Sequence, residues 1–274
     1  MRLVALSALV MVAFAANSLL NRWAVSGGLI APLPFALIRV AAGALVLGVL
    51  ARARPTRATL KPAVWLTLYL VGFSLAYSEL DAGVGALILF AGVQVTMLAG
   101  AALAGDPPTP RRLLGAGVAL LGLAGLLWPG TQAVPAPGPA LLMGLAALGW
   151  GLYSLAGRGG TAPLKATAAN FLLATPLVAL AVLPAGLGSP QPEGIALAVV
   201  AGAVTSGLGY ALWYAVLPGL GAQRAAVAQL TVPVIAIAAG ALFLGERLSP
   251  AALVAAAVVL GGVALATLPA RRVR

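Results

Sequence analysis

The chain has no cysteine and no histidine among its 274 residues. Without cysteine it forms no disulfide, thiol nucleophile or thiolate metal site. Without histidine it lacks the usual proton relay, general base and metal ligand. Charged residues are also scarce, at 8% of the chain, against about a quarter in soluble domains. A chain of this composition cannot cover a water-facing surface.

Hydrophobic residues make up 62% of the chain, and its mean hydropathy is +1.09. The apolar runs are long enough to cross a bilayer, which takes about 17–25 residues. The first run also resembles a signal peptide, because Arg2 precedes an apolar stretch that ends in small residues. We predict an all-α integral membrane protein with ten transmembrane helices, at residues 3–21, 32–51, 60–78, 82–103, 110–128, 139–157, 163–184, 194–217, 221–244 and 250–268.

The sequence contains the same unit twice. Three segments of the first half return in the same order in the second half. Residues 105–129 match 245–269, and residues 72–80 match 209–217. Near the start of each half, Phe14, Ser18, Leu19 and Arg22 match Trp150, Ser154, Leu155 and Arg158. We therefore predict two five-helix repeats, residues 1–130 and 138–274, around a central cavity. Because five is odd, the second repeat enters the membrane upside down relative to the first.

The net charge of +11 follows this topology and does not indicate a nucleic-acid partner. With the N-terminus inside, 13 of the 16 lysines and arginines fall in cytoplasmic segments. Basic residues gather on the cytoplasmic side of membrane proteins. We expect a multi-pass protein of the bacterial inner membrane with both termini in the cytoplasm.

The second half carries a family resemblance. The segments LWY (212–214), LGA (220–222), VPV (232–234) and FLGERLS (243–249) resemble the signature of the EamA branch of the drug/metabolite transporter superfamily. The resemblance implies an exporter of small metabolites, often amino acids, and extends to aromatic and neutral amino-acid exporters of the YddG type. The first copy departs from the pattern, with Val93 in place of Pro233, Asp106 in place of Glu246 and Phe14 in place of a tryptophan.

Polar and aromatic side chains inside the predicted helices are candidates for a substrate site, because an unpaired polar group in lipid is costly. Several share one helix face at i, i+3, i+4 spacing. Aromatic walls would contact an apolar substrate, and amides and hydroxyls would orient a zwitterion. The candidate substrate-binding residues are Asn17, Arg39, Tyr77, Gln94, Trp150, Tyr153, Ser154, Tyr210, Trp213, Tyr214 and Gln229.

Structural roles compete with these assignments. Tyr77 and Tyr214 would also suit the interfacial belt, and Ser154 would suit close helix packing. Arg39 is either a counter-ion for a substrate carboxylate, a snorkelling side chain, or a partner for Glu79 or Asp81.

Two prolines inside predicted helices, Pro176 and Pro233, are candidate hinges for alternating access. Each removes one backbone donor and frees a carbonyl, although static membrane helices also contain such prolines. The 34 glycines permit either helix sliding or tight packing.

No acidic residue lies deep in a predicted helix, so we expect a facilitator (a uniporter or exchanger) and no proton coupling. No ATP-binding glycine loop, cofactor site or metal site is expected, and the chain is expected to be a monomer or a homodimer. A carrier of nucleotide-sugars, a proton-coupled drug exporter and a non-transporting membrane subunit are alternatives. An enzyme is disfavoured, because paired acids, metal ligands and an activated nucleophile are missing.

Overall fold

The computed structural model describes residues 2–103, 105, 108–126, 136–156, 162–213, 215–216, 219, 228–229, 231–247 and 249–267. Every regular element in these ranges is a helix, which confirms the all-α expectation. The elements are α1 (Arg2–Ser26), α2 (Pro32–Ala51), α3 (Arg57–Ala76), α4 (Ala82–Leu103), α5 (Pro110–Leu126), α6 (Pro137–Ala156), α7 (Pro163–Val182), α8 (Pro192–Val200), η1 (Ala201–Leu208), α10 (Thr231–Phe243) and α11 (Pro250–Thr267).

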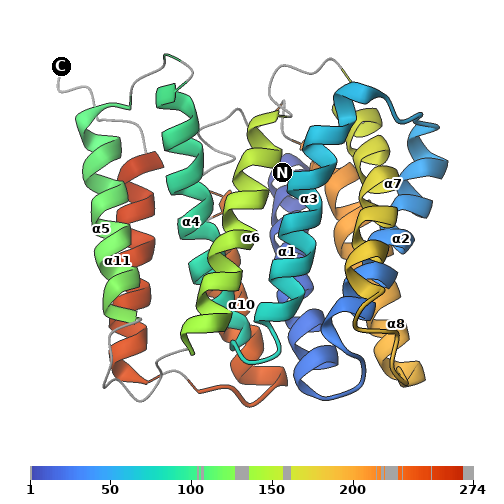
Figure 1. Cartoon of the computed structure of the whole chain (residues 1–274). Coiled ribbons are helices and arrows are strands. Elements are labelled where there is room, and N and C mark those ends of the chain that lie inside the picture. Colours follow the sequence, from blue (N-terminus) through green and yellow to red (C-terminus); the bar gives the residue numbers. More distant parts are fainter. Residues whose placement is uncertain are drawn as a thin grey trace.

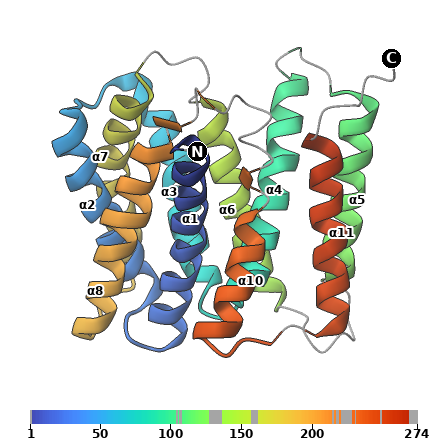
Figure 2. The same cartoon turned by 180° about the vertical axis from the view of Figure 1, so that it is seen from behind.

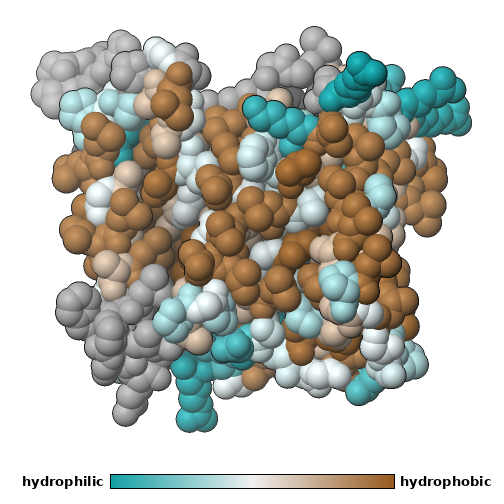
Figure 3. Space-filling model, viewed as in Figure 1, coloured by the Kyte–Doolittle hydropathy of each residue, from teal (hydrophilic) through white to brown (hydrophobic). Residues whose placement is uncertain are grey.

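Helix length and surface both suit a membrane. Seven helical stretches in the described ranges are long and apolar enough to cross one, and α10 and α11 add shorter apolar helices. The helices run roughly side by side between two rims where the connections lie (Figure 1). The face seen in Figure 3 is mostly hydrophobic between these rims, with hydrophilic residues gathered near both ends.

The predicted helix ends are close to the observed ones, with two informative differences. Helix α1 runs to Ser26, beyond the predicted end at residue 21, and stops where Gly28 takes a φ of 67°. Arg22 is therefore a helical residue whose side chain projects from the end of α1. The expected eighth helix is also not uniform, because α8 continues into the π-helix η1 before residues 209–213 return to α-helix.

The helices form three groups (Figures 1 and 2). The pair α5 and α11 lies at one end of the bundle, and α2, α7 and α8 lie at the other. Helices α1, α3, α4, α6 and α10 lie between them, and α6 packs on both α3 and α4. The middle group therefore connects the two ends.

Glycines allow α5 and α11 to approach closely. A Cβ on Gly115 would collide with the backbone of Gly262 and Ala266, and a Cβ on Gly262 with the backbone of Gly115 and Ala119. Backbone atoms cannot move aside as a side chain can. These glycines act in tight packing, one of the two roles expected from the sequence.

The prolines that we expected to be hinges differ in position. Pro176 lies inside α7 with an exposed ring, and α7 continues through it to Val182. Pro233 is the third residue of α10 and is buried. Residues 221–227, where the expected ninth helix would begin, lie outside the described residues.

The α5–α11 contact yields a first prediction. Gly115→Ala should lower the free energy of unfolding by about 1–3 kcal/mol, because the new methyl group overpacks a backbone contact. Gly117→Ala is the matched control on the same helix, since nothing lies within 4 Å of its Cβ position. The measurement is thermal unfolding of both purified variants; equal melting temperatures would contradict the packing argument.

Candidate functional site

A fully buried arginine, with no carboxylate partner among the residues that the structure describes, lies in the middle of α2. The Arg39 side chain is 0% exposed. Its Nε donates to Ser206 Oγ at 3.1 Å and its Nη2 to Tyr69 Oη at 3.0 Å, and its guanidinium lies 4.9 Å from the centre of the Phe73 ring. The third nitrogen, Nη1, is buried with no hydrogen-bond partner. Every partner of this cation is neutral.

Two of the three roles considered for Arg39 are wrong. A snorkelling side chain would reach water, whereas this one is enclosed. Asp81 cannot neutralise it, because Asp81 pairs with Arg22 at 3.2 Å, and no ion pair joins Glu79 to Arg39 in the described part of the chain. A buried guanidinium that no anion neutralises costs free energy. Arg39 is therefore well placed to bind an anionic group of a ligand.

The π-helix η1 presents two hydroxyls in succession to two different helices. Ser206 accepts from Arg39 on α2. Thr205 shares its one hydroxyl proton between Asn17 Oδ1 on α1, at 3.2 Å, and the Ala201 carbonyl of its own helix, at 2.8 Å. Gly202 allows this approach, since a Cβ there would collide with the backbone carbonyl of Arg39. Short π-helical turns inside α-helices are frequent at functional sites. Here the widened turn places polar groups beside the buried cation.

Aromatic rings pack around this polar centre. Trp150 is the hub, with ring centroids 4.9 Å from Tyr69, 5.5 Å from Tyr153 and 5.1 Å from Tyr210. Its neighbours extend the cluster to Phe73 on α3 and Tyr77 just beyond its end, to Phe171 on α7, and to Phe14 on α1, which contacts Tyr210 and Trp213. The structure thus brings together Tyr77 from the end of α3, Trp150 and Tyr153 from α6, and Tyr210 and Trp213 from the helical residues 209–213.

Buried amides add further polar points. Asn17 is almost fully buried and accepts from Thr205. Asn21, one turn along the same face of α1, is 0% exposed and donates to Ser74 Oγ at 2.9 Å, while its own Oδ1 has no partner. Asn170 on α7 also has a buried Oδ1 without a partner. These oxygens can accept hydrogen bonds from a cationic or hydroxyl group.

The remaining predicted site residues are less central. Gln94 on α4 and Gln229 are half-buried. The Ser154 hydroxyl donates to the Trp150 carbonyl of its own helix at 2.7 Å, which fits helix packing. Tyr77 is fully buried and donates to the Ala82 carbonyl, so its interfacial-belt role is wrong. Tyr214 lies outside the described residues.

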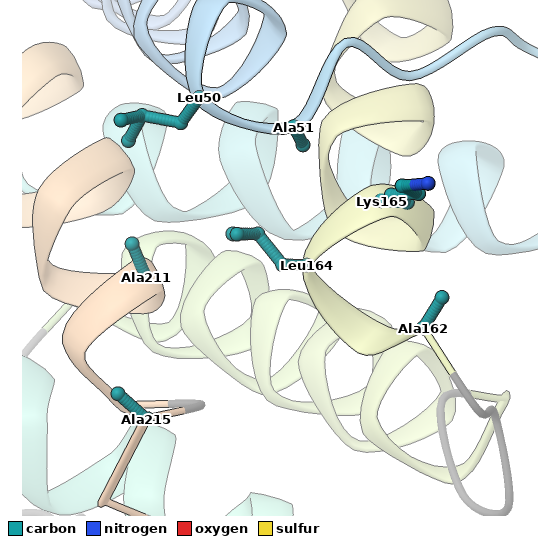
Figure 4. Close-up of a pocket in the computed structure, with 7 residues that line it drawn as sticks. All are labelled: Leu50, Ala51, Ala162, Leu164, Lys165, Ala211 and Ala215. Carbon is teal, nitrogen blue, oxygen red and sulfur yellow. The ribbon is translucent and has the colours of Figure 1, made fainter.

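Two described pockets lie away from the aromatic cluster. One, of about 440 Å³, lies between the end of α2, the start of α7, Ala211 and Ala215, with Lys165 at its edge (Figure 4). The other, of about 350 Å³, is lined by Glu246 and Arg247. Arg39 and Trp150 line neither pocket. In this conformation the Tyr69 and Phe73 rings lie against the buried cation.

A second charged cluster lies at the rim that carries the α1–α2 and α3–α4 connections, which we term the outer rim. Arg22 Nε donates to Glu246 Oε1 at 3.1 Å and Arg22 Nη2 to Asp81 Oδ1 at 3.2 Å. Both Glu246 oxygens also accept from the Ala82 amide, at 3.0 and 2.9 Å. Ala82 is the first residue of α4, so Glu246 caps the positive end of that helix.

The Glu246 carboxylate depends on these partners. Burial raises the pKa of the Glu246 carboxyl, and the Ala82 amide and the Arg22 guanidinium oppose that rise. Gly240 makes room for it, because a Cβ there would collide with Oε2 of Glu246. Removing Arg22 would therefore leave a carboxylate that burial favours in its protonated form.

Comparison with known proteins decides the family. The model of the EamA-like transporter family matches residues 138–268, and an uncharacterized protein of Pseudomonas aeruginosa is 47% identical over 98% of this chain and 95% of its own length. The chain belongs to the EamA-like transporter family. A protein of known crystal structure is 21% identical, with a TM-score of 0.69 over 97% of each chain. That likeness shows the same fold.

Membership gives the buried cluster a context. An EamA-family chain is a multi-pass membrane protein, and its family is one of transporters, generally without enzymatic activity. Sequence reasoning identified Asn17, Arg39 and the main aromatic residues of the cluster, but it missed Tyr69, Ser206 and the Asn21–Ser74 pair. A signal for Asn21 was available, since Asn17 and Asn21 are four residues apart and so share a helix face.

The neutral partners of Arg39 yield a second prediction. Tyr69→Phe should lower the free energy of unfolding by about 1–3 kcal/mol, because it leaves a second buried guanidinium donor unpaired. Arg39→Met in the same chain should recover that loss, since an apolar side chain leaves no orphan donor. Thermal unfolding of both single variants and the double variant measures the coupling; additive effects would contradict it.

Proposed function

We propose that this protein is a secondary transporter that exports small metabolites from the bacterial cytoplasm across the inner membrane. Its solutes are amino acids with aromatic or neutral side chains, and it moves them by alternating access as a facilitator. The transport unit is two inverted five-helix repeats, residues 1–130 and 138–274, with ten transmembrane helices and both termini in the cytoplasm.

The buried Arg39 carries the proposal for the substrate class. A guanidinium binds a carboxylate through two parallel hydrogen bonds. Arg39 has one nitrogen free and two held only by hydroxyls, which can rotate away when an anion arrives. A carboxylate there would neutralise the charge and satisfy Nη1.

Other buried groups of the bundle could bind the rest of an amino acid. Buried amide oxygens of Asn21 and Asn170 lack partners and can accept from an ammonium group. The rings around Trp150 offer apolar, non-directional contact to a side chain. Opening this cluster would admit a solute with one carboxylate, one ammonium group and an apolar or aromatic body.

The inverted repeat is supported by the pairing of equivalent helices. Helices α5 and α11 carry the strongest sequence repeat and pack against each other through Gly115 and Gly262. Repeat counterparts that meet at one interface are expected when two similar units are related by a pseudo-twofold axis. Each unit can then close one side of the membrane.

The facilitator mechanism is supported by where the acids lie. Glu79, Asp81 and Glu246 lie in connections, and Glu193 lies in the first turn of α8. In the described ranges no carboxylate lies deeper in a helix. A proton-coupled carrier usually has a titratable group that alternates between the two sides. The solute gradient alone then drives export.

A carrier of nucleotide-sugars is the second candidate. Its diphosphate substrate would need several cations in one place. Arg39 is the one buried cation among the described residues, which favours a singly charged anionic group.

The direct test is efflux from proteoliposomes loaded with a labelled mixture of amino acids, with and without an imposed pH gradient. We expect release of aromatic and neutral amino acids without the gradient. Release only with the gradient would contradict the facilitator mechanism. Release of nucleotide-sugars but no amino acid would contradict the substrate class.

Arg39→Gln tests the carboxylate site. It should raise the half-saturating concentration for tryptophan about 10- to 100-fold, the loss expected for a charge-assisted hydrogen bond worth about 1.5–3 kcal/mol. Tryptamine, which lacks the carboxylate, is the matched control solute and should be transported equally by both proteins. An equal loss for both solutes would contradict a carboxylate role.

A further inference from the structure

The outer-rim cluster joins parts of the chain that are far apart in sequence. Glu246 lies between α10 and α11, Arg22 lies near the end of α1, and Ala82 begins α4. The Glu246 carboxylate accepts from both partners at 2.9–3.1 Å. Arg22 also donates to the carbonyls of Tyr77 and Ser78 at the end of α3. Separating α10 from α1 and α4 at this rim breaks these bonds together.

A continuous line of buried contacts leads from this cluster to Arg39. Arg22 contacts the Tyr77 carbonyl, the Tyr77 ring lies 4.7 Å from Phe73, and Phe73 lies 4.9 Å from the Arg39 guanidinium. Tyr77 and Phe73 are both buried. Tyr77 and Phe73 therefore connect the ion pairs at the outer rim to the buried cation. With both termini in the cytoplasm, as proposed above, a solute would leave at this rim.

We propose that Arg22, Glu246 and the N-terminus of α4 form the outer gate of the transport path, and that this gate is closed in the present structure. The role of this gate in export rests on the proposed function. Its opening and closing can be measured without knowing the solute.

Burial gives this gate two distinct states. The Arg22 and Glu246 side chains are 17% and 10% exposed, so water and salt screen their attraction less than they would on an open surface. Removing one partner leaves the other charge buried and uncompensated, which is costly. Once released, the Glu246 carboxylate can be hydrated in the adjacent pocket of about 350 Å³. At intermediate distances between Arg22 and Glu246, the carboxylate is neither paired with the guanidinium nor fully hydrated.

Because the chain has no cysteine, a single introduced thiol can report on the gate. Ser74→Cys is a near-isosteric choice on α3, fully buried and one turn below Tyr77. A membrane-impermeant thiol reagent is added from the outer side of intact cells. With the gate intact we expect slow labelling. We expect the introduced thiol to be labelled at least about tenfold faster when Ser74→Cys is combined with Arg22→Gln or Glu246→Gln. A tenfold change corresponds to a loss of about 1.4 kcal/mol in the free energy that favours the closed gate.

Arg247→Gln is the matched control. Arg247 follows Glu246 in the chain and is exposed. Its replacement removes one positive charge, as Arg22→Gln does, but Arg247 makes no ion pair within the described ranges. It should leave the labelling rate unchanged. Equal labelling in all four proteins, or acceleration by Arg247→Gln as well, would overturn the gate.

Cross-linking gives a second readout that survives if the glutamine variants fold poorly. In the double variant Arg22→Cys/Glu246→Cys, a reducible bifunctional thiol reagent should stop amino-acid efflux, and reduction should restore it. Efflux that continues in the cross-linked protein would overturn the gate. A different outcome is that no tested solute moves, while labelling of Ser74→Cys still becomes faster in the Arg22→Gln and Glu246→Gln variants. That outcome would contradict the proposed substrate class but not the gate.

Discussion

A cation enclosed in the middle of the bundle without a counter-charge is the constraint on which the structure depends. Arg39 is held by two hydroxyls and aromatic rings, and these neutral groups offset part of the cost of its burial. Tyr69 and Phe73 come from α3 and Ser206 comes from η1, so α2, α3 and η1 must meet at this point. A residue that only held helices together would be better served by an apolar side chain. The free-energy cost of burying Arg39 is accounted for if a bound ligand supplies the negative charge that the described side chains do not.

The surrounding architecture follows from bringing backbones close to that cation. Gly202 lets η1 approach α2 at Arg39, and the π-helical turn directs Thr205 and Ser206 to separate helices. At the outer rim, Glu246 joins the α10–α11 connection to α1 and α4 through one carboxylate. The polar centre and the outer ion pairs are connected through α3. A change in either is therefore positioned to affect the other, which alternating access requires.

Much of the fold could be predicted from the sequence, because apolar length and helix breaks are local properties. Trp150 and Tyr153 were predicted from their helical spacing, and so were Tyr210 and Trp213. The π-helix was not predictable, since AGAVTSGL reads as ordinary helix and its widened turn arises from packing on α2. The Arg22–Glu246 pair joins residues 224 positions apart, and local patterns do not carry such pairings. The pairing of Asp81 with Arg22, in place of the Arg39 pairing that was one alternative, escaped the sequence for the same reason.

Ligand-induced stabilisation of the purified protein tests the carboxylate role of Arg39 most directly. A ligand that binds only the folded state stabilises it by about 2.7 kcal/mol at a hundred times its dissociation constant. We expect tryptophan to raise the melting temperature of the natural protein and to leave that of Arg39→Met unchanged. An equal rise in both proteins would contradict the account, because the carboxylate would then bind somewhere other than Arg39.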